Sequence, residues 1–166
     1  MLATIGYEGA KLANFLGTLQ AADIEMIVDI RERAQSRRKG FSKTALSEAL
    51  SDVGIGYQHF RSLGDPKEGR DAARRGDWNK FREIFDQVIR GDSAQSALDE
   101  VTKLAAAHKI CLLCYERDHT TCHRKIVSDI LQNRLGSRTK HLGVQEIEPS
   151  LKSVGRMLHS RQSAAA

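Results

Sequence analysis

Short apolar runs alternate with segments of helical periodicity along this chain, and no other feature limits its fold as strongly. Runs typical of buried strands occupy residues 2–6, 24–30, 54–60 and 110–115. Because the segments between them are long enough for a helical crossover, neighbouring strands are expected to run parallel. The pattern predicts an α/β protein with one open, parallel or mostly parallel sheet of four or five strands. Helices should cover both faces in a Rossmann-like, three-layer arrangement.

Helices are predicted where apolar residues recur at helical spacing behind a capping residue. The predicted helices carry Leu12, Phe15 and Leu19; Leu46 and Leu50 behind Ser42; Phe81 and Phe85 behind Asp77; Leu98 and Val101 behind Ser93; and Val127 and Leu131, in a helix over 122–135 capped by Thr120 or Thr121. Residues 61–76 are polar and are predicted to form a long loop that acts as a flap. A last short strand is predicted over 139–142, a helix from Pro149, and a frayed tail over 159–166.

Length and composition predict a single domain over residues 1–166, with its core over about residues 2–158. No apolar run approaches the roughly 20 residues that span a bilayer, and the chain opens on a strand-like segment, so a cytoplasmic location is expected. The three cysteines are an odd number within a short stretch, which argues against a disulfide framework.

Positive charge is concentrated in one part of the chain, whose formal net charge is +5. Residues 31–43 contain six arginines and lysines against the single acidic residue Glu32. Such a cluster attracts phosphates and nucleic acid, although a solvated surface of an ordinary basic protein would look the same.

Polar residues follow each predicted strand at its carboxyl end, where open α/β sheets bind their ligands. They are Tyr7 and Glu8, Asp29 and Arg31, Tyr57 and His59, Cys114 and Glu116, and then Cys122, His123 and Arg124 at the next helix. We interpret this convergence as a binding site. Glu8, Asp29, Glu116 and His123 are candidates for proton transfer, and Tyr7, Arg31, Lys43, Tyr57, His59 and Arg124 for ligand binding.

The cysteines allow more than one interpretation. Cys114 or Cys122 could act as a nucleophile, because a helix start and basic neighbours lower a thiol pKa, but a buried core cysteine is equally compatible. Cys114, His119, Cys122 and His123 supply metal donors without the two matched pairs of a structural zinc site. We therefore predict neither a metal nor a cofactor.

Several ordered motifs resemble the bacterial family catalogued as domain of unknown function 488. They are Thr4–Glu8, Val28–Arg31, Ser36, Gly40–Lys43, Gly54–His59, Leu63–Gly64, Leu112–Glu116 and Cys122–Arg124. The resemblance implies an α/β sheet fold without a settled activity. The prolines usual in that family near Ser36 and before the Cys-His pair are absent here.

Three functions are compatible with these observations. The first is an enzyme or enzyme-like domain that binds a phosphorylated ligand, either a nucleotide or a nucleic-acid end, at the carboxyl edge of the sheet. The second is a non-catalytic nucleic-acid-binding module that uses the basic residues of 31–43 and of the loop over 61–75. The third is a sulfurtransferase, because Val28–Glu32 resembles the second-strand signature of rhodanese-type enzymes and Cys114 ends a later strand.

Overall fold

A five-stranded parallel sheet forms the centre of the protein, whose computed structural model describes residues 1–146. The strands are β1 (Leu2–Gly6), β2 (Met26–Asp29), β3 (Gly56–His59), β4 (Ile110–Cys114) and β5 (Lys140–Leu142). Their order in the sheet is β3-β2-β4-β1-β5, with every pair parallel. The predicted α/β fold is confirmed. The helix predicted from Pro149 and the tail over 159–166 lie outside the described residues.

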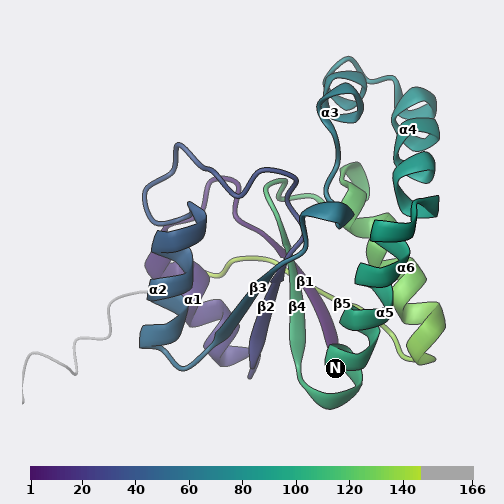
Figure 1. Ribbon diagram of the computed structural model, residues 1–166. Coiled ribbons are helices and arrows are strands. Elements are labelled where there is room, and N and C mark those ends of the chain that lie inside the picture. Colours follow the sequence, from purple (N-terminus) through teal and green to yellow (C-terminus); the bar gives the residue numbers. More distant parts are fainter. Residues whose placement is uncertain (147–166) are drawn as a thin grey trace, which may run out of the picture.

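In the described part of the chain, residues 1–146, six α-helices pack around the sheet; Figure 1 shows their arrangement. They are α1 (Leu12–Ala21), α2 (Lys43–Asp52), α3 (Lys67–Arg74), α4 (Trp78–Arg90), α5 (Asp92–Ala107) and α6 (His123–Leu135). Helices α1 and α2 lie on one side of the sheet and α5 and α6 on the other, while α3 and α4 rise beyond its carboxyl edge (Figure 1). Within residues 1–146, no helix combines the length and the apolar character needed to cross a membrane.

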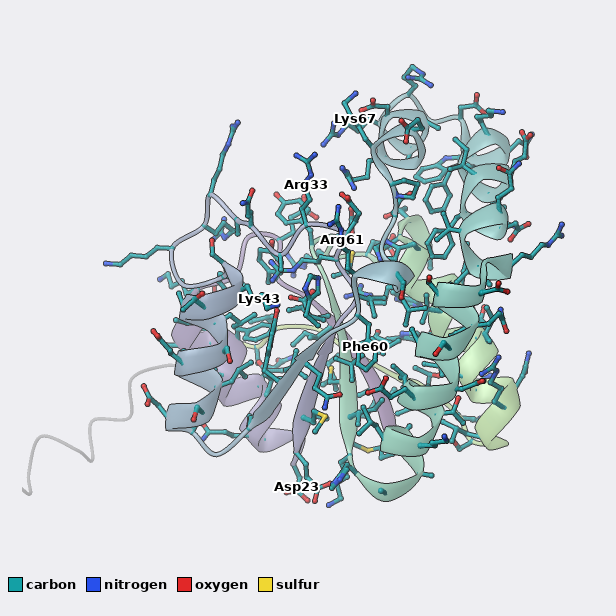
Figure 2. The ribbon with its side chains drawn as sticks, in the orientation of Figure 1. Asp23, Arg33, Lys43, Phe60, Arg61 and Lys67 are labelled. Atoms are coloured by element: carbon teal, nitrogen blue, oxygen red, sulfur yellow. The ribbon has the colours of Figure 1, made fainter. Side chains whose placement is uncertain are left out.

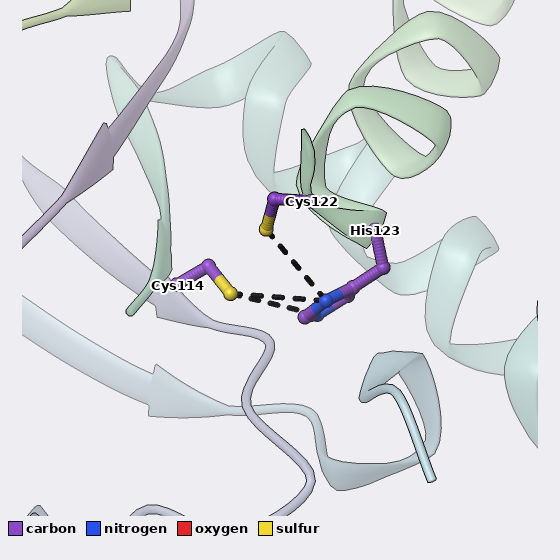
Figure 3. Close-up of side chains that lie close together, drawn as sticks. All are labelled: Cys114, Cys122 and His123. Atoms are coloured by element: carbon purple, nitrogen blue, oxygen red, sulfur yellow. Dashed lines mark hydrogen bonds between the residues drawn. The ribbon is translucent and has the colours of Figure 1, made fainter. Parts of the chain in front are cut away.

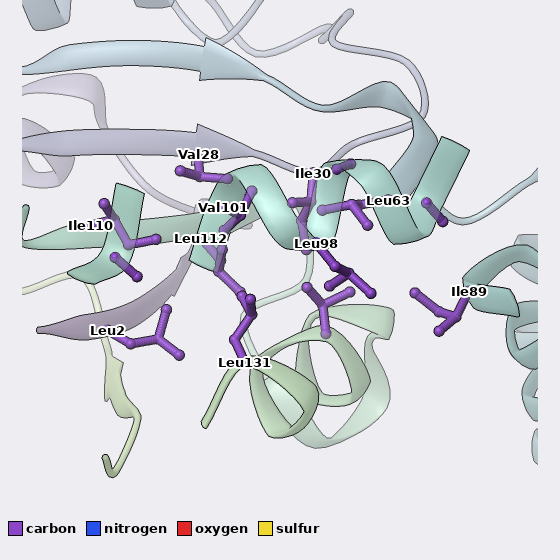
Figure 4. Close-up of a cluster of buried hydrophobic side chains, with 14 of the residues drawn as sticks. Leu2, Val28, Ile30, Leu63, Ile89, Leu98, Val101, Ile110, Leu112 and Leu131 are labelled. Atoms are coloured by element: carbon purple, nitrogen blue, oxygen red, sulfur yellow. The ribbon is translucent and has the colours of Figure 1, made fainter. Parts of the chain in front are cut away.

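The two faces of the sheet follow from the two-residue period of its strands. Leu2, Val28 and Leu112 pack into one hydrophobic cluster with residues of α5 and α6 (Figure 4). The alternate residues, such as Ile5 and Cys111, pack into a second cluster with α1 and α2. Both clusters consist of hydrophobic residues, and burying a polar group among them would cost free energy, so most polar residues of the strands lie at the strand ends.

The segment over 61–76 differs from the predicted long loop. It forms a short 3₁₀ helix, η1 (Arg61–Leu63), and then the eight-residue helix α3, which begins after Pro66. Helix α3 could not be predicted from the sequence, because only two of its residues, Gly69 and Ala72, are buried. Two small residues do not produce the apolar periodicity that indicates a helix.

Helix caps agree with the sequence at two positions and differ at others. Ser42 takes the N-cap position of α2, as predicted, although its side chain makes no capping hydrogen bond. Asp77 caps α4 by accepting a hydrogen bond from the Lys80 backbone N–H, as predicted. The prediction that a helix starts at Ser93 is wrong by one residue, because α5 begins at Asp92 and Gly91 takes the cap position. Neither Thr120 nor Thr121 caps α6; both belong to the 3₁₀ helix η2 (His119–Thr121), and Cys122 takes the cap position.

Candidate functional site

A cleft of about 380 Å³ opens at the carboxyl edge of the sheet, between the segment that follows β2 and helix α3. We call it the arginine cleft because six arginines line it, namely Arg31, Arg33, Arg37, Arg38, Arg70 and Arg74. Figure 2 shows Arg33 and Lys67 beyond this edge and Asp23 at the opposite end of the sheet. The strand-end geometry expected of a ligand site is therefore present.

Acidic side chains neutralise only part of this charge. Glu32 lies 3.1 Å from Arg61, 3.2 Å from Arg70 and 3.6 Å from Arg33. Within residues 1–146, Arg37 and Arg38 form no salt bridge. The cleft consequently keeps an excess of positive charge that an anion can satisfy.

A second hollow of about 280 Å³ adjoins the arginine cleft and shares Arg70, Arg74 and Tyr115 with it. Trp78 at the start of α4 also lines this hollow. The side chains of Trp78 and Tyr115 are 42% and 44% exposed, although large aromatic residues are usually covered. Exposed aromatic faces beside basic side chains are typical of sites that stack nucleobases.

Buried charges hold the segment that follows β2 in place. Asp29 is fully buried and accepts hydrogen bonds from the Arg31 guanidinium, with a shortest distance of 2.6 Å, and from the Tyr57 hydroxyl at 2.6 Å. Arg31 also donates to the Tyr7 hydroxyl and to the Phe41 carbonyl. Burial and the negative charge of Asp29 raise the pKa of Tyr57. Every oxygen of Asp29 is therefore engaged in structural contacts.

Cys114, Cys122 and His123 form a buried cluster at the floor of the cleft (Figure 3). Cys114 ends β4 on the face that carries α6, so the first residues of α6 come against it. Its Sγ lies 3.7 Å from His123 Nδ1, and the Cys122 Sγ lies 3.8 Å from the same nitrogen. The Cys114 thiol donates a hydrogen bond to Glu116 Oε2 at 2.8 Å.

The cluster perturbs the titration of each of its members. Burial opposes ionisation of Cys114, but the hydrogen bond from Cys122 and the charge of His123 outweigh it and lower the pKa of Cys114. The pKa of His123 rises to about 9 because the Cys114 charge outweighs burial. Burial and then Cys114 raise the pKa of Glu116 to about 7, so this carboxyl can exchange a proton near neutral pH.

The structure brings together five of the predicted site residues in the arginine cleft, namely Tyr7, Arg31, Cys114, Glu116 and His123. Cys122 lines the adjoining hollow. Asp29 and Tyr57 lie beneath these residues in the network described above.

The remaining predicted residues lie elsewhere. Glu8 is exposed and accepts a hydrogen bond from the Arg117 backbone N–H. Lys43 and His59 line a further hollow, which shares Glu32 and Arg33 with the arginine cleft. There His59 Nε2 contacts the Arg31 carbonyl at 2.7 Å. Arg124 is 1% exposed and donates to the carbonyls of Glu116 and Arg117, so it does not face the cleft.

Sequence reasoning did not single out Asp65 or Trp78, and it included Arg70 and Arg74 only among the basic residues of the loop over 61–75. All four line one or both of the two hollows. A signal for them exists, since Arg70 and Arg74 are one helical turn apart and are followed closely by the single tryptophan of the chain. Asp65 is buried, and burial raises its pKa to about 6.

Fold and site together define a doubly wound α/β protein with a basic cleft at the carboxyl edge of a parallel sheet. The family model described as Domain of unknown function DUF488 matches residues 11–131. The chain belongs to this family, which confirms the resemblance seen in the sequence. No curated protein and no solved structure matches the chain in the corresponding comparisons.

Proposed function

We propose that this protein binds a phosphorylated ligand, a nucleotide or a nucleic-acid end, in the arginine cleft. The observation that carries the proposal is the convergence of six arginines on one cleft, of which Arg37 and Arg38 form no salt bridge within residues 1–146. Guanidinium groups bind phosphate oxygens through paired, charge-assisted hydrogen bonds. A phosphate in this cleft would replace water around cations that the protein itself leaves without counter-ions.

The adjoining hollow favours a nucleotide over a simpler phosphate ester. A base placed there would lie against the exposed faces of Trp78 or Tyr115, while its phosphates reach the shared residues Arg70 and Arg74. Base–aromatic stacking contributes about 1–3 kcal/mol per base. Glu116 faces the same cleft and is the carboxyl group placed to exchange a proton with the bound ligand.

The single tryptophan of the chain provides a direct assay. Titration with ATP, AMP, a 5′-phosphorylated oligonucleotide and inorganic phosphate should quench Trp78 fluorescence only for ligands that carry a base. Replacing both Arg37 and Arg38 with alanine should weaken binding of these ligands about tenfold or more, because one charged contact contributes about 1.5 kcal/mol.

Arg82→Ala is the matched control, because Arg82 is an exposed arginine of α4 that lines neither hollow. Its affinity should equal that of the unmodified chain. Equal affinity in the Arg37/Arg38 double variant, or no binding of any phosphorylated ligand, would overturn the proposal. Binding of DNA alone, with a steep linear fall of log affinity with log salt, would instead support the non-catalytic nucleic-acid module.

Sulfur transfer is a second candidate because the Cys114 thiol lines the cleft and has a lowered pKa. It requires thiosulfate turnover that disappears in Cys114→Ser. Turnover that survives this substitution, or its absence in the unmodified chain, would exclude it.

A further inference from the structure

We propose that Cys114, Cys122 and His123 form a zinc site at the floor of the arginine cleft. The ligand atoms of these three residues lie within 4.8 Å of one another, and all three side chains are buried. Two thiolates and one imidazole are a donor set that zinc accepts readily in proteins. The site goes beyond the proposed ligand binding in the arginine cleft and does not depend on it, but a Cys114 thiolate bound to zinc is not available for the sulfur transfer named as the second candidate.

The spacing of the atoms suits a tetrahedral ion. Zinc bonds of about 2.3 Å to sulfur and about 2.0 Å to nitrogen place neighbouring ligand atoms about 3.6 Å apart. His123 Nδ1 lies 3.7 Å from Cys114 Sγ and 3.8 Å from Cys122 Sγ, as the dashed lines of Figure 3 show. Cys114 Sγ also lies 4.0 Å from Nε2, so binding of the ion would require this sulfur to move away from Nε2 and toward the lone-pair direction of Nδ1.

The orientation of the imidazole is fixed from outside the cluster. His123 Nε2 lies 2.9 Å from the Ile30 carbonyl and donates its hydrogen to that oxygen. Nδ1, which lies within 3.8 Å of both sulfurs, is therefore the nitrogen that would give up its proton to bind the ion. A backbone carbonyl that fixes the second ring nitrogen is the usual support of a metal-binding histidine.

Arg124 contacts one of the two sulfurs through its backbone. The Arg124 backbone N–H donates to Cys122 Sγ at 3.4 Å, and its guanidinium is 1% exposed with no hydrogen bond from Nε or Nη1 within residues 1–146. A buried cation without a carboxylate partner favours anionic sulfur nearby. A cluster of two neutral thiols would leave this charge without compensation.

One tetrahedral position remains for a ligand from the cleft. Cys114 and His123 line the arginine cleft, and Cys122 and His123 line the adjoining hollow, so the cluster borders both. Glu116 Oε2 lies 2.8 Å from Cys114 Sγ and is close enough to reach the ion directly or through water. Three protein ligands and an accessible fourth position are the arrangement of catalytic zinc sites.

Metal analysis of the purified, tag-free full chain tests the site. We expect about one zinc ion per chain, lost to below about a tenth in Cys114→Ser and in Cys122→Ser. Cys111→Ala is the matched control, because Cys111 lies on the same strand but packs on the opposite face of the sheet. It should retain the zinc. Circular dichroism verifies that the variants fold.

Cobalt substitution of the unmodified chain makes the test independent of variant folding. Tetrahedral thiolate ligation should give a thiolate-to-cobalt charge-transfer band and visible d–d bands. An unmodified chain that holds neither zinc nor cobalt after reconstitution overturns the proposal, as does zinc retained when Cys114 and Cys122 are both replaced. Nucleotide titrations of the Arg37/Arg38 variant test the proposed function separately, so either idea can fail alone.

Discussion

Removal of the Asp29 carboxylate should destabilise the fold strongly, because this side chain compensates a buried cation. Asp29→Ala would leave Arg31, which is 5% exposed, without its salt bridge and the Tyr57 hydroxyl without its acceptor. Breaking a buried ion pair by removing one partner costs about 3–5 kcal/mol. That is a large fraction of the total stability of a domain, which is about 5–15 kcal/mol.

Urea unfolding followed by circular dichroism measures this loss as a lower midpoint at unchanged slope. Asp86→Ala is the control, because Asp86 is exposed on α4, and its effect should stay within about 0.5 kcal/mol. Combining Asp29→Ala with Arg31→Met should recover part of the loss, because the uncompensated charge disappears. The reasoning is refuted if the free energy of unfolding of Asp29→Ala lies within about 1 kcal/mol of that of the unmodified chain. It is also refuted if the double variant loses as much stability as the two single variants added together.

Three further effects can be measured in the same way. Gly6→Ala should lower the free energy of unfolding by more than about 3 kcal/mol, since a Cβ at this position would lie 1.8 Å from the Glu116 carbonyl oxygen. Gly136→Ala should lower it by about 1 kcal/mol, because Gly136 has a φ of 62° but open space around it. Equal losses in the two variants would contradict this. Leu50→Ala should cost about 2–5 kcal/mol in urea unfolding because Leu50 is fully buried between α2 and the sheet, and a loss below 1 kcal/mol would contradict that burial. Asp65 has a folded pKa of about 6 against 3.8 for the ordinary group, so the folded state holds a proton that the unfolded state releases between these values. The free energy of unfolding should therefore fall by up to about 3 kcal/mol as pH rises from about 4 to about 6. This dependence on pH should be weaker in Asp65→Asn. If the free energy of unfolding changes with pH equally in both chains, Asp65 is not the cause of the change.

The sequence was sufficient to predict the sheet because strands buried on both faces are continuous apolar runs. The alternation that makes Leu112 and Cys111 face opposite layers also follows from the strand period. Helix α3 could not be found in this way, because it is short and presents only two small residues to the protein. Its position beside the segment that follows β2 is a tertiary result, and that position creates the arginine cleft.

The sequence predicted which edge of the sheet the candidate site residues reach, but not the contacts that they make there. The predicted strand ends place Asp29 and Glu116 correctly at the same edge of the sheet. The spacing does not show, however, that the carboxylate of Asp29 is occupied by hydrogen bonds from Arg31 and Tyr57. A hint was available, because residues 29 and 31 are two positions apart and so lie on the same side of an extended chain. The burial of Arg124 could not be predicted from the sequence. It depends on hydrogen bonds to the backbone carbonyls of Glu116 and Arg117, which only the folded chain brings into place.

Charge connects the arginine cleft to the cluster at its floor. A zinc ion, two thiolates and the Glu116 carboxylate together carry a single negative charge, which matches the buried guanidinium of Arg124. Arg37 and Arg38, which form no salt bridge within residues 1–146, then remain available to an incoming anion instead of neutralising the floor. With both thiols protonated, the buried cation would stay uncompensated and would add to the excess charge of the rim. The Cys114 cluster and the arginine cleft are therefore better understood as parts of one electrostatic arrangement than as neighbours by accident.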